Sequence, residues 1–321
     1  KNYMLRSFFI MLSKVKWAQK LIMGMGFARK MATRFVAGDK LSDAIEAIKG
    51  LNKIGIFATL DHLGENTTNE TEAGKATQDV IEMVDAIDQS GIQSNISIKL
   101  SQIGYTLGID LCTRNLKAIL EYAQQKGIFV RIDMEDSTTT EETIRLCLEM
   151  RQSGFNRVGI VIQSYLYRSE DDIRKLCQSA TPVRLCKGAY KEPEIVAFPK
   201  KSDVDENYDK LTSLLMDGEK SIGSPGGSDN GRTPPIPAIA THDEKRVDYA
   251  KSYADKIELS REAFEFQMLY GIRRDLQETL VKEGYHVRTY VPFGTQWYPY
   301  YMRRLAERPA NLWFMVSNLF R

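Results

Sequence analysis

The C-terminal end of the sequence places two adjacent arginines, Arg303 and Arg304, in a run rich in tyrosine. Paired guanidinium groups can hold a carboxylate through several parallel, charge-assisted hydrogen bonds. The flanking tyrosines offer flat apolar walls and hydroxyl groups. Glu307 follows Arg303 by four residues, a spacing that also fits an ordinary ion pair on an exposed helix face. These residue types indicate either a binding site for a planar anion or a solvated ion pair.

The elements that would position such a site follow from two alternating sequence patterns. Short β-rich segments alternate with amphipathic segments of helical period, such as 77–89, 115–126 and 141–152. The expected strands cover 55–61, 95–100, 128–133, 158–163, 183–187, 238–242, 264–269 and 287–291. Eight strands alternating with helices predict an α/β fold, a TIM-like (β/α)8 barrel with a parallel sheet.

Polar residues stand at the C-terminal end of nearly every expected strand. They are Asp61, His62, Lys99, Asp133, Gln163, Arg184, Lys187, Thr241, His242, Gln267 and Tyr290. In a (β/α)8 barrel this rim carries the active site, which is built from the loops that follow the strands. One polar strand end would mean little, but their convergence predicts a catalytic site.

Two cationic residues of this rim, Lys99 and Arg184, could take part in catalysis at a barrel mouth, and each could instead have a structural role. Lys99 could be a Schiff-base nucleophile, or it could pair with a buried carboxylate such as Asp133. We favour the ion pair and keep a Schiff-base aldolase or lyase as the alternative. Arg184 could stabilise an anionic reduced ring system, or it could form a structural salt bridge. Gly188 would let the backbone approach a ligand closely.

Signatures of metal hydrolases and of dinucleotide-binding domains are weak in this sequence. It has three histidines and no HxH pair, so we expect no catalytic metal, although Asp61, His62, Asp133 and Glu135 are spare oxygen and nitrogen ligands. The stretch 24–29 resembles half of a dinucleotide fingerprint, but it lacks the third glycine and a preceding strand.

Charge and cysteine usage exclude some classes of protein. The 321 residues include 44 basic and 42 acidic ones, a net charge of +2, which gives no reason to expect nucleic-acid binding. Four scattered cysteines without a CxxC spacing fit a reducing compartment, so we expect a cytoplasmic protein. No apolar run is long enough to span a bilayer.

The N-terminal segment differs from the rest, because apolar residues and lysines or arginines fill it and no acid precedes Asp39. We expect a helical arm over residues 1–38 and a catalytic barrel over 39–321. Such an arm packs on the main domain or lies on a membrane surface, here the inner face of the cell membrane. Packing is the interpretation we favour, and the pattern is not that of a signal peptide.

One segment has the composition of an insertion. Residues 222–237 are rich in glycine, serine and proline and lie between the fifth and sixth expected strands. This composition predicts a flexible surface loop.

Seven motifs, taken in order, resemble those of the proline dehydrogenase family, the monofunctional FAD enzymes that oxidise L-proline. They are IKLS around Lys99, RIDMED around Asp133, VIQSYLYR around Gln163, RLCKGAY around Arg184, AIATHDE around His242, FQMLYG around Leu269, and YVPFG with YYMRRLAERPAN near the C-terminal end. Each motif alone is weak, whereas seven in order at compatible spacing are specific. The resemblance extends over about residues 39–314.

By this resemblance, FAD would lie across the C-terminal mouth of a distorted barrel with L-proline against its ring. Arg303 and Arg304 match the pair that binds the proline carboxylate, and Glu307 matches the acid that steadies them. The other residues matched to the substrate site are Lys99, Tyr190, Leu269, Tyr290 and Tyr300. The residues matched to FAD contacts are Met134, Gln163, Lys187, Gly188, Ala189, Thr241 and His242. The catalytic matches are Asp133, an acid linked to the arginine network, and Arg184, the arginine beside flavin N5.

The resemblance also implies the reaction. The family oxidises L-proline to Δ1-pyrroline-5-carboxylate by hydride transfer from C5 to flavin N5 and passes the electrons to membrane quinone. That acceptor would give the basic N-terminal arm a use at the bilayer surface. Lys191 departs from the pattern, because some relatives have a tryptophan there against the flavin. The 222–237 segment is a second departure, which we expect to affect the adenine end of the site.

Overall fold

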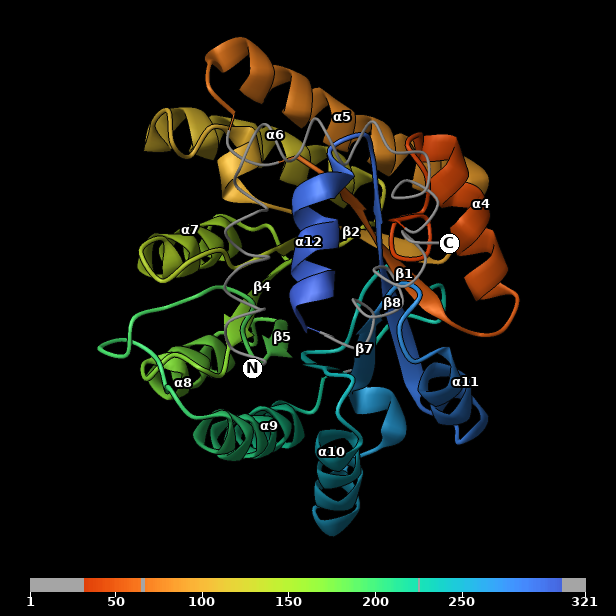
Figure 1. Ribbon diagram of the computed structural model, residues 1–321, viewed down its shortest axis with the longest axis vertical. Helices are drawn as coiled ribbons and strands as arrows, with labels where there is room; N and C mark the ends of the chain where they lie inside the picture. The colour runs from red at the N-terminus through yellow and green to blue at the C-terminus, as the bar shows by residue number, and fades with distance from the viewer. Residues whose placement is uncertain (1–31, 65–66, 225, 308–321) are drawn as a thin grey trace, which may run out of the picture.

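The computed structural model describes residues 32–64, 67–224 and 226–307, with side chains through Arg304. Eight strands form a closed barrel, in which each strand pairs in parallel with its neighbours in sequence and the last pairs with the first (Figure 1). The strands are β1 (Phe57–His62), β2 (Ser94–Ile98), β3 (Val130–Ile132), β4 (Val158–Gln163), β5 (Val183–Cys186), β6 (Pro237–Ala240), β7 (Glu265–Leu269) and β8 (His286–Phe293). The predicted (β/α)8 barrel is confirmed.

Helices surround this barrel, and one of them has a different position. The outer helices are α4 (Leu41–Asn52), α5 (Glu70–Ser90), α6 (Ile109–Gln125), α7 (Thr140–Gln152), α8 (Ser169–Gln178), α9 (Lys201–Ile222), α10 (Glu244–Lys256) and α11 (Arg274–Lys282). Two short 3-10 helices are η1 (Leu100–Ile103) and η2 (Arg261–Ala263). The last helix, α12 (Trp297–Glu307), lies inside the ring of outer helices (Figure 1).

Local signals explain where the helices begin and end. In α5, the side chain of Asn69 accepts a hydrogen bond of 2.9 Å from the backbone N–H of Glu72. The helix ends at Gly91, which has a φ of +66°, and the N–H of Gly91 donates to the carbonyl of Ile87. The helix expected over 77–89 therefore begins earlier, at Glu70. The sequence pattern missed this start because the first turn is polar and shows no apolar periodicity.

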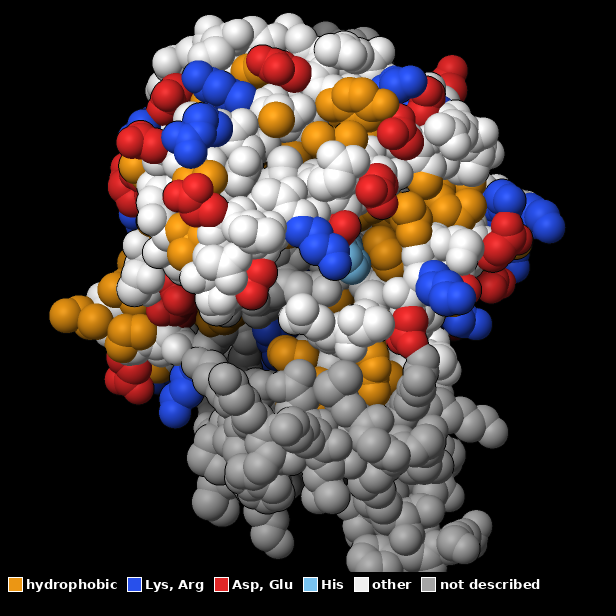
Figure 2. Space-filling view, turned by 90° about the horizontal axis from the view of Figure 1, so that it is seen from above, with side chains coloured by type: hydrophobic (Ala, Val, Ile, Leu, Met, Phe, Trp, Pro, Cys, Tyr) orange, Lys and Arg blue, Asp and Glu red, His pale blue; other side chains and the backbone are white. Residues whose placement is uncertain are grey.

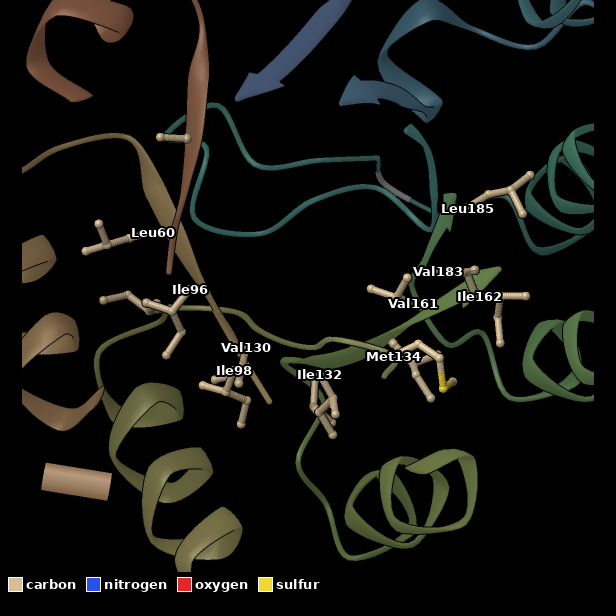
Figure 3. Close-up of a cluster of buried hydrophobic side chains, with 14 of the residues drawn as sticks. Leu60, Ile96, Ile98, Val130, Ile132, Met134, Val161, Ile162, Val183 and Leu185 are labelled. Carbon is tan, nitrogen blue, oxygen red and sulfur yellow. The ribbon is translucent and has the colours of Figure 1, made fainter. Parts of the chain in front are cut away.

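The outer face of the strands is apolar and packs against the helices. Figure 3 shows Ile98, Ile132 and Leu185 between their strands and the surrounding helices, and all three are buried. Burial of this layer supplies the main hydrophobic stabilisation of the fold.

The inner face of the strands is unusually polar for this fold, in which branched apolar side chains ordinarily fill the barrel. The register places Asp61 beside Ser97, and Ser97 beside Arg131. On the far side it places Gln267 beside Arg288. All five side chains are buried, so the barrel interior is a polar layer inside an apolar one.

The segment between α9 and β6 differs from the expectation of a flexible surface loop. The carbonyl of Gly231 accepts a hydrogen bond of 2.8 Å from Arg288 at the start of β8, and the carbonyl of Arg232 accepts one from the N–H of Phe129, just before β3. The guanidinium of Arg232 also bonds Asp88 at the end of α5. The segment therefore packs under the N-terminal ends of the strands. This position follows from topology, because a connection from helix to strand lies at the face opposite the active-site loops, and the expected effect on the adenine end of the site is wrong.

Residues just before α4 join the barrel near α12. The N–H of Ala37 donates to the carbonyl of Pro292, and Gly294 donates to Gly38. Residues 1–31 of the predicted arm lie outside the described part of the chain. Within that part, no helix is long and apolar enough to cross a membrane. Acidic and basic side chains are intermixed over the face seen in Figure 2.

Candidate active site

Five of the predicted site residues lie just beyond the strands rather than in them. The strands β2, β3, β5 and β6 end before Lys99, Asp133, Lys187, Thr241 and His242. The expected strands were too long there, because each chain leaves the hydrogen-bonded ladder as it turns toward the helix. These residues still lie at the mouth, on the loops where this fold places its active sites.

Asp133 is the centre of the hydrogen-bond network at the mouth. Its Oδ1 accepts from Arg184 Nη1 at 2.8 Å and from Ser97 Oγ at 3.0 Å. Its Oδ2 accepts from the hydroxyl of Tyr290 at 2.8 Å. Burial and the Asp133 charge raise the pKa of Tyr290 well above its ordinary value, so this hydroxyl remains a donor. The structure thus brings three predicted residues, from the loop after β3, from β5 and from β8, into direct contact.

Lys99 pairs with two carboxylates. Its Nζ lies 3.2 Å from Asp61 Oδ1 and 3.7 Å from Asp133 Oδ2, and it donates to the Tyr290 hydroxyl at 3.4 Å. The predicted ion pair with Asp133 is confirmed, and Asp61 is the closer partner. Burial raises the pKa of Asp61, although the charge of Lys99 opposes this. Sequence reasoning gave Asp61 no role in substrate or cofactor binding, although its position at a strand end was the available signal.

Arg184 is held on two of its edges and on one face. Besides the bond to Asp133, its Nε donates to Oε1 of Gln267 on β7. Its Cζ lies 5.2 Å from the centre of the Tyr290 ring, in cation–π range. Its Nη2 is buried and has no hydrogen-bond partner among the described residues. The mouth therefore contains a cationic donor whose remaining edge suits an electron-rich group.

The apolar residues predicted around the substrate gather in one cluster. Tyr300 on α12 belongs to it. Leu269, the last residue of β7, and Tyr290, within β8, pack against it. Trp297 and Tyr301 of α12 belong to the same cluster. Because α12 packs against Leu269 of β7 and Tyr290 of β8, it covers the barrel mouth instead of joining the outer ring of helices (Figure 1).

The arginine pair lies on this covering helix. Arg304 is buried, and its Cζ lies 5.0 Å from the centre of the Tyr300 ring, whereas Arg303 is half-buried. Burial raises the pKa of Cys186, the last residue of β5, to about 11. The positive charges of Arg184 and Arg304 oppose this rise. Arg304 therefore faces the interior of the fold, whereas the alternative of a solvated ion pair concerned Arg303 and Glu307. The predicted role of the Glu307 side chain lies outside the described side chains.

The loop after β5 is braced by side chains from neighbouring loops. Gln163 accepts from the N–H of Ala189 at 3.2 Å, and its amide donates to the carbonyl of Glu135 at 2.8 Å. Gly188 has a φ of +129°, and a Cβ there would lie 2.6 Å from the ring of Tyr165. Glycine is thus required by both backbone and space, and it lets this loop pass close to the mouth.

Three further predicted cofactor contacts lie on the loops after β5 and β6 and already have protein partners. Lys187 bonds Asp243 at 2.7 Å and also bonds Asp205. His242 accepts at Nε2 from the N–H of Leu269 at 2.9 Å, and Thr241 Oγ1 accepts from the N–H of Asp243 at 3.1 Å. Met134 is buried beside Asp133, and Tyr190 is half-buried in the loop after β5.

Comparison with known proteins agrees with this geometry. A sequence model of the family described as Proline dehydrogenase matches residues 44–317. Proline dehydrogenase 1 of Bacillus subtilis (strain 168) is 40% identical over 319 residues, which cover 99% of this chain and 100% of that protein. Proline dehydrogenase of Deinococcus radiodurans is 40% identical over 295 residues, covering 91% of this chain and 90% of that protein.

A solved structure shares the fold. The crystal structure of proline utilization A (PutA) from Bdellovibrio bacteriovorus, inactivated by N-propargylglycine, superposes with a TM-score of 0.76 at 27% identity. The match covers 87% of this chain and 32% of that one, so the chain spans about a third of that longer protein. Because the family model covers most of the barrel and relatives match along their full length, the chain belongs to the family of proline dehydrogenase enzymes.

Proposed function

We propose that this chain catalyses the FAD-dependent oxidation of L-proline to Δ1-pyrroline-5-carboxylate and delivers the electrons to a membrane quinone. The observation that carries the proposal is the arrangement at the mouth. A cation network around Asp133 lies below α12, which carries the buried Arg304 and the adjacent Arg303. The charges of these two sets of groups would suit a carboxylate-bearing ring with an oxidisable C–N bond.

The residues at the mouth fit a flavin. The free buried edge of Arg184 supplies a hydrogen-bond donor and positive charge, which suit an isoalloxazine ring that gains negative charge on reduction. Gly188 lets the loop after β5 pack directly against the ring of Tyr165. We assign Met134, Gln163, Arg184, Lys187, Gly188, Ala189, Thr241 and His242 to hold FAD. When bound, FAD supplies the two-electron acceptor for the hydride that leaves C5 of proline.

The chain itself would bind and orient the substrate. Arg303 and Arg304 would hold the proline carboxylate with charge-assisted bonds. Tyr190, Leu269, Tyr290 and Tyr300 would form the walls around the pyrrolidine ring, and Glu307 would steady the arginine pair. We expect orientation to contribute more than acid–base catalysis, because a neutral amine needs no strong base at carbon.

Below the ring, polar side chains keep the charges in place. Lys99 and Tyr290 would hold the Asp133 side chain in place, and Asp133 in turn holds Arg184. This assigns Asp133 and Arg184 the catalytic roles and Lys99 a place near the substrate carboxylate.

A Schiff-base lyase is not favoured by the surroundings of Lys99. Nζ of Lys99 donates to Asp61 and to the Tyr290 hydroxyl and lies 3.7 Å from Asp133, so it already serves protein groups, whereas a Schiff-base lysine needs a free amine. Trapping of a carbonyl substrate on Lys99 by borohydride, with no flavin required, would support that alternative.

The location of the reaction is also part of the proposal. Quinone is dissolved in the membrane, so we propose a cytoplasmic protein that contacts the inner face of the cell membrane through its N-terminal arm, residues 1–38. Deletion of residues 1–31, which keeps the part of the arm bonded to the barrel, should lower turnover with a membrane quinone while leaving turnover with a soluble artificial acceptor unchanged.

The deciding experiment is a visible spectrum of the purified protein after incubation with FAD, followed by anaerobic addition of L-proline. A flavin band that bleaches with proline is the expected result. A flavin band that does not change with proline would support FAD as the cofactor and contradict proline as the substrate. A protein that stays colourless would contradict the whole proposal.

A further inference from the structure

Arg184 is connected to the bottom of the barrel by a chain of buried side chains. Its Nε donates to Oε1 of Gln267, and the amide Nε2 of Gln267 donates to Oε1 of Glu265. Arg288 then donates to both oxygens of Glu265, at 2.8 and 3.1 Å, and to the carbonyls of Ala58 and Gly231 at 2.8 Å each. All four side chains of the chain are at most 5% exposed.

The hydrogen bonds in this series of side chains can run in one direction only. A primary amide can present either its oxygen or its nitrogen to a neighbour. Here the Glu265 carboxylate accepts only, so it requires the Nε2 of Gln267, and Oε1 is left facing Arg184. Arg288 neutralises Glu265 and holds the pKa of that carboxyl below its usual range, although burial opposes this. Gln267 is therefore fixed as an acceptor toward Arg184.

Small neighbours leave room for this arrangement. The register places Ala238 beside both Arg184 and Glu265, and Ala240 beside Gln267. Only the methyl groups of Ala238 and Ala240 therefore lie between β5 and β7 inside the barrel, and the long side chains of Arg184 and Gln267 can meet across them.

We propose that Gln267 and Glu265 are positioning residues that fix the guanidinium plane of Arg184 at the barrel mouth. Asp133 holds Nη1 and Gln267 holds Nε, and two fixed nitrogens of a planar group determine where the third, Nη2, points. Without the Gln267 acceptor, the guanidinium donates to described residues only through Nη1, to Asp133 and Ser97, so its plane beside the Tyr290 ring is less tightly fixed. The catalytic use of Arg184 rests on the proposed function, whereas its fixed geometry does not.

The first test measures the Arg184 Nε–H itself, in protein without cofactor. Its NMR signal is assigned by its loss in Arg184→Lys, and its exchange with solvent is followed. Gln267→Met keeps the side-chain length and removes the acceptor, so exchange should become about tenfold or more faster. The exchanged pair, Glu265→Gln with Gln267→Glu, again offers an acceptor to both arginines and should restore slow exchange.

The matched control is Gln277→Met on α11. Gln277 is also buried and hydrogen-bonded, to Thr289 at 2.9 Å and to the carbonyl of Ile272 at 2.8 Å, but these bonds do not touch Arg184. It should lower stability while leaving the Arg184 exchange rate unchanged. An exchange rate in Gln267→Met equal to that of the wild type, or raised equally by both variants, would overturn the proposal.

The second test uses the FAD-loaded enzyme. Gln267→Met should lower kcat about tenfold with little change in KM for proline, because the α12 arginines are untouched. A rise in KM with unchanged kcat would contradict the positioning role. If the wild type neither binds FAD nor oxidises proline, the proposed function fails, and the exchange rates still decide the role of Gln267.

Discussion

At the scale of single residues, the mouth is a set of opposite charges held at short distances. Asp133 contacts Arg184 at 2.8 Å and Lys99 at 3.7 Å, in a region that water reaches poorly. Charges so arranged interact strongly but need their partners, because an unpaired buried charge is costly. The residue types and the pairing of Lys99 with Asp133 could be predicted from strand ends. That Asp61 is the closer partner could not, because several carboxylates meet at this rim and only the packing decides between them.

Arg303→Met should raise KM for proline about 10- to 100-fold, the effect of losing charge-assisted hydrogen bonds to a carboxylate. Bound FAD, measured by the absorbance of the purified variant, should stay near the wild-type level. Arg174→Met, which removes an exposed ion pair with Glu170, is the control and should leave KM unchanged. Loss of flavin from Arg303→Met, with KM unaltered, would contradict the carboxylate role.

Asp61 should make stability depend on pH. Burial raises its pKa above the ordinary 3.8, so the folded protein holds this proton more tightly than the unfolded chain does. The stabilisation from this group is complete below about pH 4 and is lost as the pH rises through the folded pKa. Relative to Asp61→Asn, the wild type should therefore lose free energy of unfolding as the pH rises above about 4.

Urea unfolding at a series of pH values measures this difference. The exposed Asp171, changed to asparagine, is the control and should give a curve parallel to the wild type. A parallel curve for Asp61→Asn as well would show that Asp61 does not have the expected raised pKa.

At the scale of elements, two segments of the chain close the barrel at its two ends. Helix α12 covers the mouth, and residues 226–236 pack under the N-terminal ends of the strands. Composition alone predicted mobility for the second segment, because glycine and proline are common in free loops. Those residues serve here to fit a tight path, since a Cβ at Gly231 would lie 2.5 Å from Phe57.

Gly231→Ala should destabilise the protein by about 2–4 kcal/mol, from the positive φ and from overpacking against Phe57. Gly74→Ala is the matched control, because Gly74 lies within α5 and a Cβ there would meet nothing within 4 Å. It should stabilise the protein by about 0.5–1 kcal/mol. Denaturant midpoints measure both changes, and equal midpoints for the two variants would mean that the segment is not packed in solution.

At the scale of the whole molecule, burial of the apolar layer outside the strands offsets the free-energy cost of a polar barrel interior. Four cations, Lys99, Arg131, Arg184 and Arg288, lie inside the barrel. The carboxylates there are Asp61, Asp133 and Glu265. This excess of positive charge suits a cofactor that gains negative charge on reduction.

Burial across the fold should also make the thiols unreactive. It raises the pKa of Cys112 and Cys147 to about 12 and that of Cys177 and Cys186 to about 11. At pH 8, native protein should react with Ellman's reagent at least about 100-fold more slowly than denatured protein, because the thiolate is the reacting form. The denatured chain should release four equivalents. Rapid reaction of one thiol in native protein would locate an opening of the fold.

The sequence by itself determined the parallel barrel, the polar rim and the family, because each depends on local pattern or on motif order. The period of apolar residues predicts strands and helices, and the C-terminal strand ends of such a barrel meet at one rim. What only the tertiary structure decided is which side chains meet across the barrel. Arg184 reaches Gln267 over 83 residues of chain and Tyr290 reaches Asp133 over 157, and barrel closure alone brings them together. The place of α12 over the mouth was decided in the same way, since helical period specifies a buried face but not the surface that buries it.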